Sequence, residues 1–290
     1  MPTSSSPTVR RRRLAAELRS LRTRTGQTAD QVGRALGWSK AKVSRYELAR
    51  SGLKPADVAR LLDFYGVQGA QREQLLVLAE EATLKGWWEA YSDGLTEGYL
   101  AFIGLEAEAT SILEWQLNVV PGLLQTERYA REVMSGYQEV ATVSPMAIQR
   151  RVETRLIRQQ LLTRDEPLEL VTVLDESILY RQRGDRSVML GQLQRLAEVS
   201  ELSNVTVRIL PLNRHHGLAV GSFAILRFGR PDETTLHDVV SLESLVNEVY
   251  VESDTGTHQF RLAFDHLTED SLSPLESRDL ILTIARQVWS

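Results

Sequence analysis

Two short helical segments that flank a glycine-containing turn constrain the fold of this chain more than any other feature of its sequence. Thr28 and Ser39 are each suited to begin a helix, because their side-chain oxygens can accept a backbone N–H. Gly37 lies in the turn, where a left-handed backbone is expected, and Gly33 is a small residue where the two helices cross. This arrangement of two short helices around a turn is the pattern of a helix-turn-helix.

The flanking sequence predicts three more helices, which would complete a five-helix domain. A first helix over 10–24 carries an apolar stripe at helical spacing, and two periodic segments, 56–65 and 70–84, follow the motif. The stripe of the first helix consists of Leu14, Leu18 and Leu21. Within the motif, the side chains expected to point inward are those of Val32, Ala35, Leu36, Val43 and Tyr46.

The charge of the chain is divided unevenly. The net charge is -4, but residues 1–80 carry 15 Lys and Arg against 7 Asp and Glu, whereas the remainder carries 19 against 31. A basic first part on an acidic remainder favours a nucleic-acid-binding domain joined to a body with another task. On charge alone, a basic face that only keeps the protein in solution is an equally open interpretation. The arginine run 10–13 is either a flexible arm on DNA or a solubilising segment.

The composition excludes several classes of protein. With 42% hydrophobic and 25% charged residues, the chain is typical of a globular protein, and its 290 residues suggest two domains. Because the sequence has no Cys, it has no disulfide framework, thiolate metal site or Cys nucleophile. No stretch approaches the roughly 20 apolar residues of a spanning helix, and no secretory signal is recognisable. We therefore expect a disordered tail over 1–9, no membrane association and a location in the cytoplasm at the nucleoid.

The stretch from Thr28 to Glu47 resembles the five-helix, lambda-repressor-like DNA-binding domain of XRE-family regulators. In that family an arginine of the first helix pairs with a glutamate at the end of the third. Arg22 and Glu47 occupy these positions, so the resemblance implies a structural pair between them. One residue departs from the family pattern: Ala29 begins the second helix, where a glutamine that binds phosphate is common.

The third helix, expected over 40–49, supplies the candidate DNA contacts. In a helix-turn-helix the N-terminal residues of this helix face base edges in the major groove. Lys40 and Arg45 have the reach to donate hydrogen bonds to guanine, whereas Lys42 and Arg50 are interpreted as phosphate contacts. The full set of candidates is Thr28, Ser39, Lys40, Ala41 (suited to a thymine methyl), Lys42, Ser44, Arg45 and Arg50.

After a helix-turn-helix domain over 10–85, residues 86–290 are expected to form a mixed α/β domain of the α+β type. Strands are predicted at 111–116, 168–174, 205–210, 222–228, 238–242 and 248–252. Helices are predicted at 99–108, 126–135, 145–162, 187–202, 256–267 and 274–288. The order strand, helix, strand over 168–210 predicts a parallel pair with a right-handed crossover, and the later strands indicate an antiparallel meander.

Several stretches of this second part resemble an actinobacterial regulator family that includes WhiJ-like regulators of Streptomyces development. They are residues 86–88, 103–109, 120–126, 204–211 and 267–276. In that family an XRE domain is fused to one uncharacterised C-terminal domain, with no enzymatic activity and no established ligand. Some members are described as antitoxin-like, and members are often encoded beside a small BldB-like protein.

The second part contains no recognisable catalytic or metal-binding spacing, so we expect no enzyme activity, metal or cofactor. The interpretation as loop surface, rather than metal ligands, applies to His215, His216, His237, Asp238 and Glu243. Asp175 and Glu176 at a strand end are interpreted as capping residues. Core or interdomain packing, rather than a small-molecule pocket, is the favoured interpretation for the aromatic residues Trp87, Trp88, Tyr91, Tyr99, Phe102 and Trp115.

Together these patterns predict a sequence-specific DNA-binding transcriptional regulator, a homodimer on a double-stranded, inverted-repeat operator. The C-terminal domain would serve regulation, dimerisation and the binding of a partner protein or an unknown small-molecule effector. The alternative is an antitoxin-like interaction protein that binds a small cognate partner and autoregulates its operon. In the last helix, an apolar stripe either forms a dimer seam or, as we favour, closes the core of its own domain; it consists of Leu280, Ile284 and Val288, with Ile281 beside it.

Overall fold

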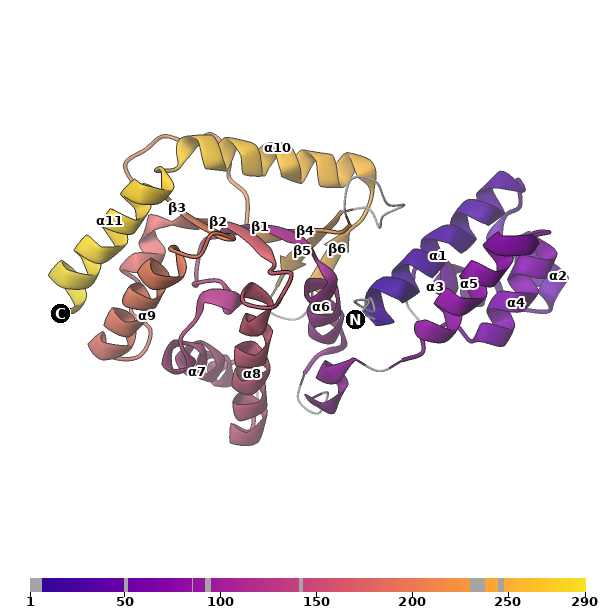
Figure 1. Ribbon diagram of the computed structural model, residues 1–290, viewed down its shortest axis with the longest axis horizontal. Coiled ribbons are helices and arrows are strands. Elements are labelled where there is room, and N and C mark those ends of the chain that lie inside the picture. The colour runs from indigo at the N-terminus through magenta and orange to yellow at the C-terminus, as the bar shows by residue number, and fades with distance from the viewer. Residues whose placement is uncertain are drawn as a thin grey trace. The chain divides into compact units, whose positions relative to one another are not determined.

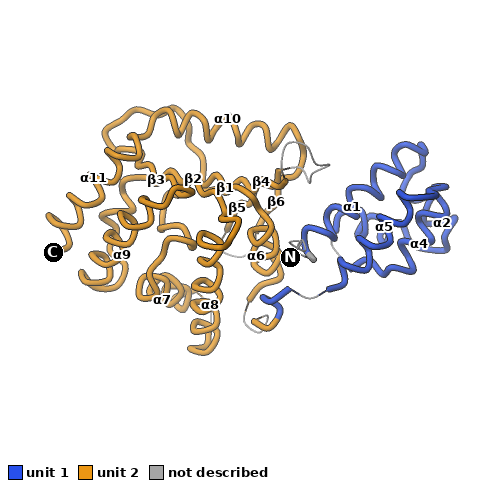
Figure 2. Tube along the Cα trace, in the orientation of Figure 1, with its two compact units in different colours: residues 1–89 blue, residues 90–290 orange. Residues whose placement is uncertain are grey.

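The computed structural model describes residues 7–49, 52–84, 86–91, 95–140, 143–229, 238–244 and 248–290. The chain divides into two compact units, residues 1–89 and 90–290 (Figure 2), so the division falls a few residues later than expected. The first unit is built from helices, and the second combines helices with a six-stranded sheet (Figure 1). The predicted fold class, an all-α first domain followed by an α+β domain, is confirmed.

Five α-helices form the first unit. They are α1 (Pro7–Arg24), α2 (Ala29–Leu36), α3 (Lys40–Glu47), α4 (Pro55–Phe64) and α5 (Gly69–Glu81). Because α1 begins at Pro7, residues 7–9 are helical, and the expectation of a disordered tail over these residues is wrong. The helix α3 ends at Glu47 rather than at residue 49, and Ala49 has a left-handed backbone with φ of 52°.

One apolar core holds the five helices together. Leu14 and Leu18 of α1 are fully buried, and the core also contains Val32 of α2 and Val43 of α3. Ala35 was expected to point inward, but it lies on the exposed side of α2. A side chain at Gly33 would place its Cβ 2.8 Å from the carbonyl oxygen of Trp38, so only glycine allows this close crossing of α2 and the turn.

The second unit contains a mixed sheet in the order β3-β2-β1-β4-β5-β6. The strands are β1 (Ser111–Gln116), β2 (Glu169–Asp175), β3 (Val205–Leu210), β4 (Phe223–Arg227), β5 (Val239–Glu243) and β6 (Glu248–Val251). Each predicted strand is present, with ends within one residue of the expected ones. The pairs β1–β2 and β2–β3 are parallel, whereas β1–β4, β4–β5 and β5–β6 are antiparallel, which confirms the predicted parallel unit and meander.

The helices of the second unit are α6 (Glu97–Glu108), α7 (Glu127–Gly136), α8 (Pro145–Arg158), α9 (Arg186–Val199), α10 (Asp254–Asp270) and α11 (Pro274–Ile284). Three of them, α8, α9 and α11, end three or four residues before the expected one, and after α8 and α11 the chain continues in another helical form. A 3-10 turn over Gln159–Leu162 follows α8, and a π turn over Ala285–Trp289 follows α11.

The sheet has helices on both faces. On one face, α10 packs Phe264 and Leu267 against Trp115 and Val173 (Figure 1). On the other face lie α6, α8 and α9 (Figure 1). Alternation along β1 explains the division, because side chains of neighbouring strand residues point to opposite faces. Within the described segments, no helix has the length and apolar character needed to cross a membrane.

The last helix completes the core of this unit. Ile281 and Ile284 of α11 are buried, and the indole N–H of Trp289 donates to the carbonyl of Leu179 at 2.8 Å. Leu280 and Val288 are only half-buried, so the buried stripe is rotated from the expected one. The favoured interpretation, a helix that closes its own core, therefore fits the structure.

Candidate functional site

The helix α3 presents one buried and one exposed face. Val43 and Tyr46 face the core, whereas Lys40, Ala41 and Arg45 are exposed. Ser44 is half-buried between the two faces. The structure therefore leaves the two side chains with the longest reach, Lys40 and Arg45, on the solvent side of the helix that was expected to carry the base contacts.

Capping residues fix where the motif helices begin. Thr28 accepts a hydrogen bond from the Gln31 amide at 3.2 Å, and the Gln31 side chain accepts one from the Thr28 amide at 2.8 Å. Ser39 accepts from the Lys42 amide at 3.1 Å. Thr28 and Ser39 thus lie at helix N-termini, where free backbone N–H groups favour an anion such as a phosphate.

An ion pair ties α1 to the end of α3. Arg22 donates through Nε to one oxygen of Glu47 at 2.7 Å and through Nη2 to the other at 2.9 Å. Its Nη1 also donates to the carbonyl of Gln27 at 2.8 Å. The hydrogen bond with Glu47 raises the pKa of Arg22. The two residues that the resemblance pairs are therefore in contact, through both oxygens of a Glu47 side chain of which only 8% is exposed, and the pair ties α1 to the end of α3.

Lys42 is held inside its own domain. Its ammonium group forms an ion pair with Asp57 of α4 at 2.8 Å and lies 4.0 Å from the centre of the Trp38 ring. Tyr46 donates to the same carboxylate at 2.6 Å. Burial alone raises the pKa of Asp57, but the bonds from Lys42 and Tyr46 hold it below its ordinary value. This geometry argues against the interpretation of Lys42 as a phosphate contact.

Sequence reasoning missed two residues that support α3 and its turn. Asp57 binds Lys42 and Tyr46, as described above, and thereby ties α3 to α4. Arg60 donates to the carbonyl of Leu36 at 2.7 Å, and its guanidinium lies 5.0 Å from the centre of the Trp38 ring. An Asp and an Arg one turn apart at the start of α4 were the available signal.

Other basic residues of the first unit have different fates. Residues 10–13 lie within α1, and Arg10 is 2% exposed and donates to the Glu81 carbonyl at 3.2 Å. The flexible-arm alternative is therefore wrong for Arg10. Arg50 lies outside the described residues. Ala29, the departure from the family pattern, is partly buried against the core.

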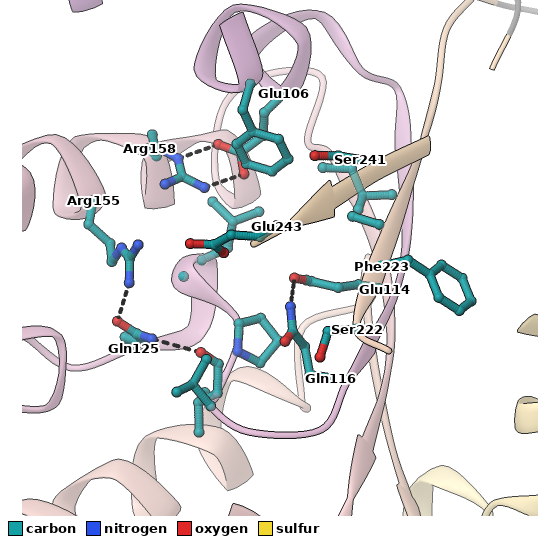
Figure 3. A pocket seen from close by; sticks show the side chains of 18 of the residues that line it. Glu106, Glu114, Gln116, Gln125, Arg155, Arg158, Ser222, Phe223, Ser241 and Glu243 are labelled. Atoms are coloured by element: carbon teal, nitrogen blue, oxygen red, sulfur yellow. Dashed lines mark hydrogen bonds and ion pairs between the residues drawn. The ribbon is translucent and has the colours of Figure 1, made fainter. Parts of the chain in front are cut away.

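The second unit contains a cavity of about 100 Å³ on the sheet face that α6 and α8 cover (Figure 3). Side chains of β1, β4, β5 and β6 line one side, and α6, α8, residues 119–123 and Gln125 line the other. Tyr99 and Phe102 are among the lining residues, so for these two aromatic residues the favoured interpretation as packing residues is incomplete. Trp115, by contrast, is a core residue on the α10 face.

A buried ion pair forms one wall of the cavity. Arg158 is 4% exposed and Glu106 2% exposed, and they are joined by bonds of 2.5 and 2.6 Å. Arg158 also donates to the Tyr99 hydroxyl at 2.5 Å. Burial alone raises the pKa of Tyr99, but the Arg158 and Arg155 charges hold it below its ordinary value. Arg155 donates to the Gln125 side chain at 2.9 Å.

Among the described residues, the other candidate groups of the second unit form no cluster of metal-ligating side chains. His215 is exposed and His216 half-buried in the segment between β3 and β4, and His237 lies outside the described residues. The described segments contain no group of three His, Cys, Asp or Glu side chains that could hold a metal ion. Asp175 accepts from the Ser177 amide at 2.9 Å, which confirms its role as a cap.

Comparison with protein families assigns both units. Residues 13–75 match a helix-turn-helix domain, and residues 99–283 match a domain of unknown function, DUF5753. No curated protein matches the sequence significantly. The helix-turn-helix match lies within the five-helix unit and includes α3, which exposes Lys40 and Arg45. The second match covers most of the chain, including the sheet and the cavity. The chain therefore belongs to the DUF5753 family, here joined to an N-terminal helix-turn-helix domain.

Proposed function

We propose that this chain is a sequence-specific transcriptional regulator that reads DNA with α3 and is modulated through its C-terminal domain. The observation that carries the proposal is the exposed face of α3, with Lys40, Ala41 and Arg45 on a helix fixed from behind. The Arg22–Glu47 pair holds α3 against α1, and the Lys42–Asp57 pair holds it against α4. A rigidly held helix presents its side chains to base edges at small entropic cost.

The roles of the side chains follow from their exposure and partners. Lys40 and Arg45 donate to guanine O6 and N7, and Ala41 touches a thymine methyl group. Ser44, half-buried, is placed for a shorter contact. Thr28 and Ser39 lie at helix N-termini that receive phosphates. Lys42, which is paired with Asp57, positions α3 rather than binding the backbone of DNA.

A homodimer on inverted half-sites extends this proposal. One helix-turn-helix reads only a few base pairs, and linking two raises the effective concentration of the second contact. Closed two-fold symmetry is the commonest oligomeric arrangement, and half-sites would lie about one helical turn (34–36 Å) or a multiple apart. Light scattering on the full chain tests the dimer, and a monomer that protects a single half-site would contradict it. The antitoxin-like alternative, including a BldB-like partner, rests on the resemblance alone.

Selection of bound duplexes from a random DNA pool with the full chain tests the proposed function. We expect one enriched sequence, and Arg45→Ala should cost about 1–3 kcal/mol on it and relax the base preference at one position. Arg72→Ala is the matched control, because Arg72 on α5 already pairs with Asp63 at 3.0 Å. Absence of any enriched sequence, or an unchanged preference in Arg45→Ala, would overturn the docking described above.

A further inference from the structure

The sheet register places polar and small side chains in one row beneath the cavity. Glu114 of β1 pairs with Ala224 of β4, and Ala224 pairs with Ser241 of β5. All three residues line the cavity. Neighbouring strands are about 4.8 Å apart, so Glu114 and Ser241 stand about 10 Å from each other with only a methyl group between them. The small side chain of Ala224 therefore leaves the space that the larger neighbours surround.

Ser241 supplies a hydroxyl that faces this space without a hydrogen-bond partner among the described residues. The residue is 6% exposed, and none of the residues described by the structure forms a hydrogen bond with its hydroxyl. Figure 3 shows the hydroxyl turned toward the side of the cavity that Glu106 and Arg158 form. The hydroxyl is therefore free to donate to, or accept from, a molecule that enters the cavity.

The carboxylates of the cavity outnumber its uncommitted cations. Arg158 is bound to both oxygens of Glu106, and Arg155 donates to Gln125. Glu114 accepts a hydrogen bond from the side-chain amide of Gln116 at 2.6 Å, and Glu243 accepts one from the Tyr137 hydroxyl at 3.5 Å. Within the described segments, neither of these two carboxylates forms an ion pair.

Glu248, which also lines the cavity, accepts from the Thr96 hydroxyl at 3.3 Å. Burial, with Glu106 and Glu243 nearby, raises the pKa of Glu114 to about 7, although the Gln116 amide and Arg158 act in the opposite direction. A cation would relieve this crowding of carboxylates.

We propose that the cavity binds a small organic cation, a protonated alkylamine, whose ammonium group donates to the carboxylates of Glu114 and Glu243 and to the Ser241 hydroxyl. The buried side chains of Ile112 and Leu123, which also line the cavity, receive the apolar body. The inference concerns the site itself; only a role of the amine as an effector of DNA binding rests on the function proposed above.

Three probes of one shape separate the charge of the ligand from its size. Calorimetric titration of the full chain without DNA uses butylammonium, 1-butanol and butanoate. We expect butylammonium to bind at least about tenfold more tightly than 1-butanol or butanoate. A tenfold difference is what one charge-assisted hydrogen bond between the ammonium group and a carboxylate would supply. The anion is included because the Nε of Arg155 has no partner among the described residues. Equal or tighter binding of butanoate, or no binding of butylammonium, would overturn the proposal.

Variants then place the bound amine in the cavity. Glu114→Gln and Glu243→Gln keep the side-chain shape, and each should weaken butylammonium binding about tenfold while leaving butanol binding unchanged. Ala224→Leu fills the space and should abolish binding of both. Glu198→Gln on α9, outside the cavity lining, is the matched control and should bind like the unaltered chain. Full binding by the Glu114→Gln, Glu243→Gln double variant, confirmed as folded by circular dichroism, would refute the site. Because DNA is absent, failure of the DNA-binding proposal leaves this result intact.

Discussion

The two units of this chain each contain a bidentate Arg–Glu pair, but they direct their remaining charges in opposite ways. In the first unit, Arg22–Glu47 fixes α3 from behind, and Lys40 and Arg45 point outward to solvent. In the second unit, Arg158–Glu106 is buried at a cavity wall, and further carboxylates line the same cavity, among them the half-buried Glu114 and the exposed Glu243. Cations that face the solvent suit a large polyanion such as DNA, whereas carboxylates that line a cavity suit a small cation that fits inside it.

The sharpest test of this comparison is to break the buried pair. Glu106→Ala should lower the free energy of unfolding of the second unit by about 3–5 kcal/mol, because Arg158 is left charged in a site from which water is excluded. Urea unfolding followed by circular dichroism measures the loss. The double variant Glu106→Met, Arg158→Met is the control and should recover most of the stability, since no uncompensated charge remains. A loss below about 1 kcal/mol in Glu106→Ala would mean that the pair is solvated like a surface pair.

The corresponding pair of the first unit should cost less to break. Glu47→Ala removes two charge-assisted hydrogen bonds from Arg22, but 18% of the Arg22 side chain stays exposed and can be hydrated. We expect a loss of about 1.5–3 kcal/mol, with the base preference unchanged. A double-mutant cycle with Arg22→Met measures the coupling. A coupling near zero would remove this pair from the support of α3.

The sequence predicted the fold better than it predicted the partners of individual charges. Strand ends were correct to within a residue because β-branched runs bounded by turn residues are local signals, as at 205–210. The caps at Thr28 and Ser39 were equally local. The cavity was not predicted, because it depends on the register that brings Glu114, Ala224 and Ser241 into one row, and the strand order that sets this register is a long-range property.

The carboxylates that line the cavity should also make the stability of the second unit depend on pH. The pKa of Glu114 is raised to about 7 in the folded chain, mainly by burial, above its value in an unfolded chain. The folded state therefore holds this proton more tightly, so its contribution to stability is present at low pH and is lost as the pH rises through about 7. The charges of Glu106 and Glu243 add to this rise in the pKa of Glu114, and the side-chain amide of Gln116 and the charge of Arg158 oppose it.

Glu114→Gln should remove this loss and make the second unit more stable than the unaltered chain at alkaline pH, by about 1–3 kcal/mol, with no gain at acidic pH. Unfolding curves of both proteins over a pH series measure the difference. The Glu198→Gln variant, whose carboxylate is exposed on α9, should show no such trend. A constant difference between Glu114→Gln and the unaltered chain at every pH would contradict a titrating carboxyl at this position.

The smallest expected effect concerns Lys42, which tests whether every cation of α3 faces outward. Each phosphate contact contributes about -0.9 to the slope of log K against log salt for DNA binding. Because the ammonium of Lys42 is held by Asp57 at 2.8 Å and by the Trp38 ring, Lys42→Met should leave this slope unchanged. The first unit should lose only about 0.5–1 kcal/mol of stability, since the pair is partly exposed. A slope that becomes shallower by about 0.9 would show that Lys42 leaves Asp57 for a phosphate, and the inward assignment would then be wrong.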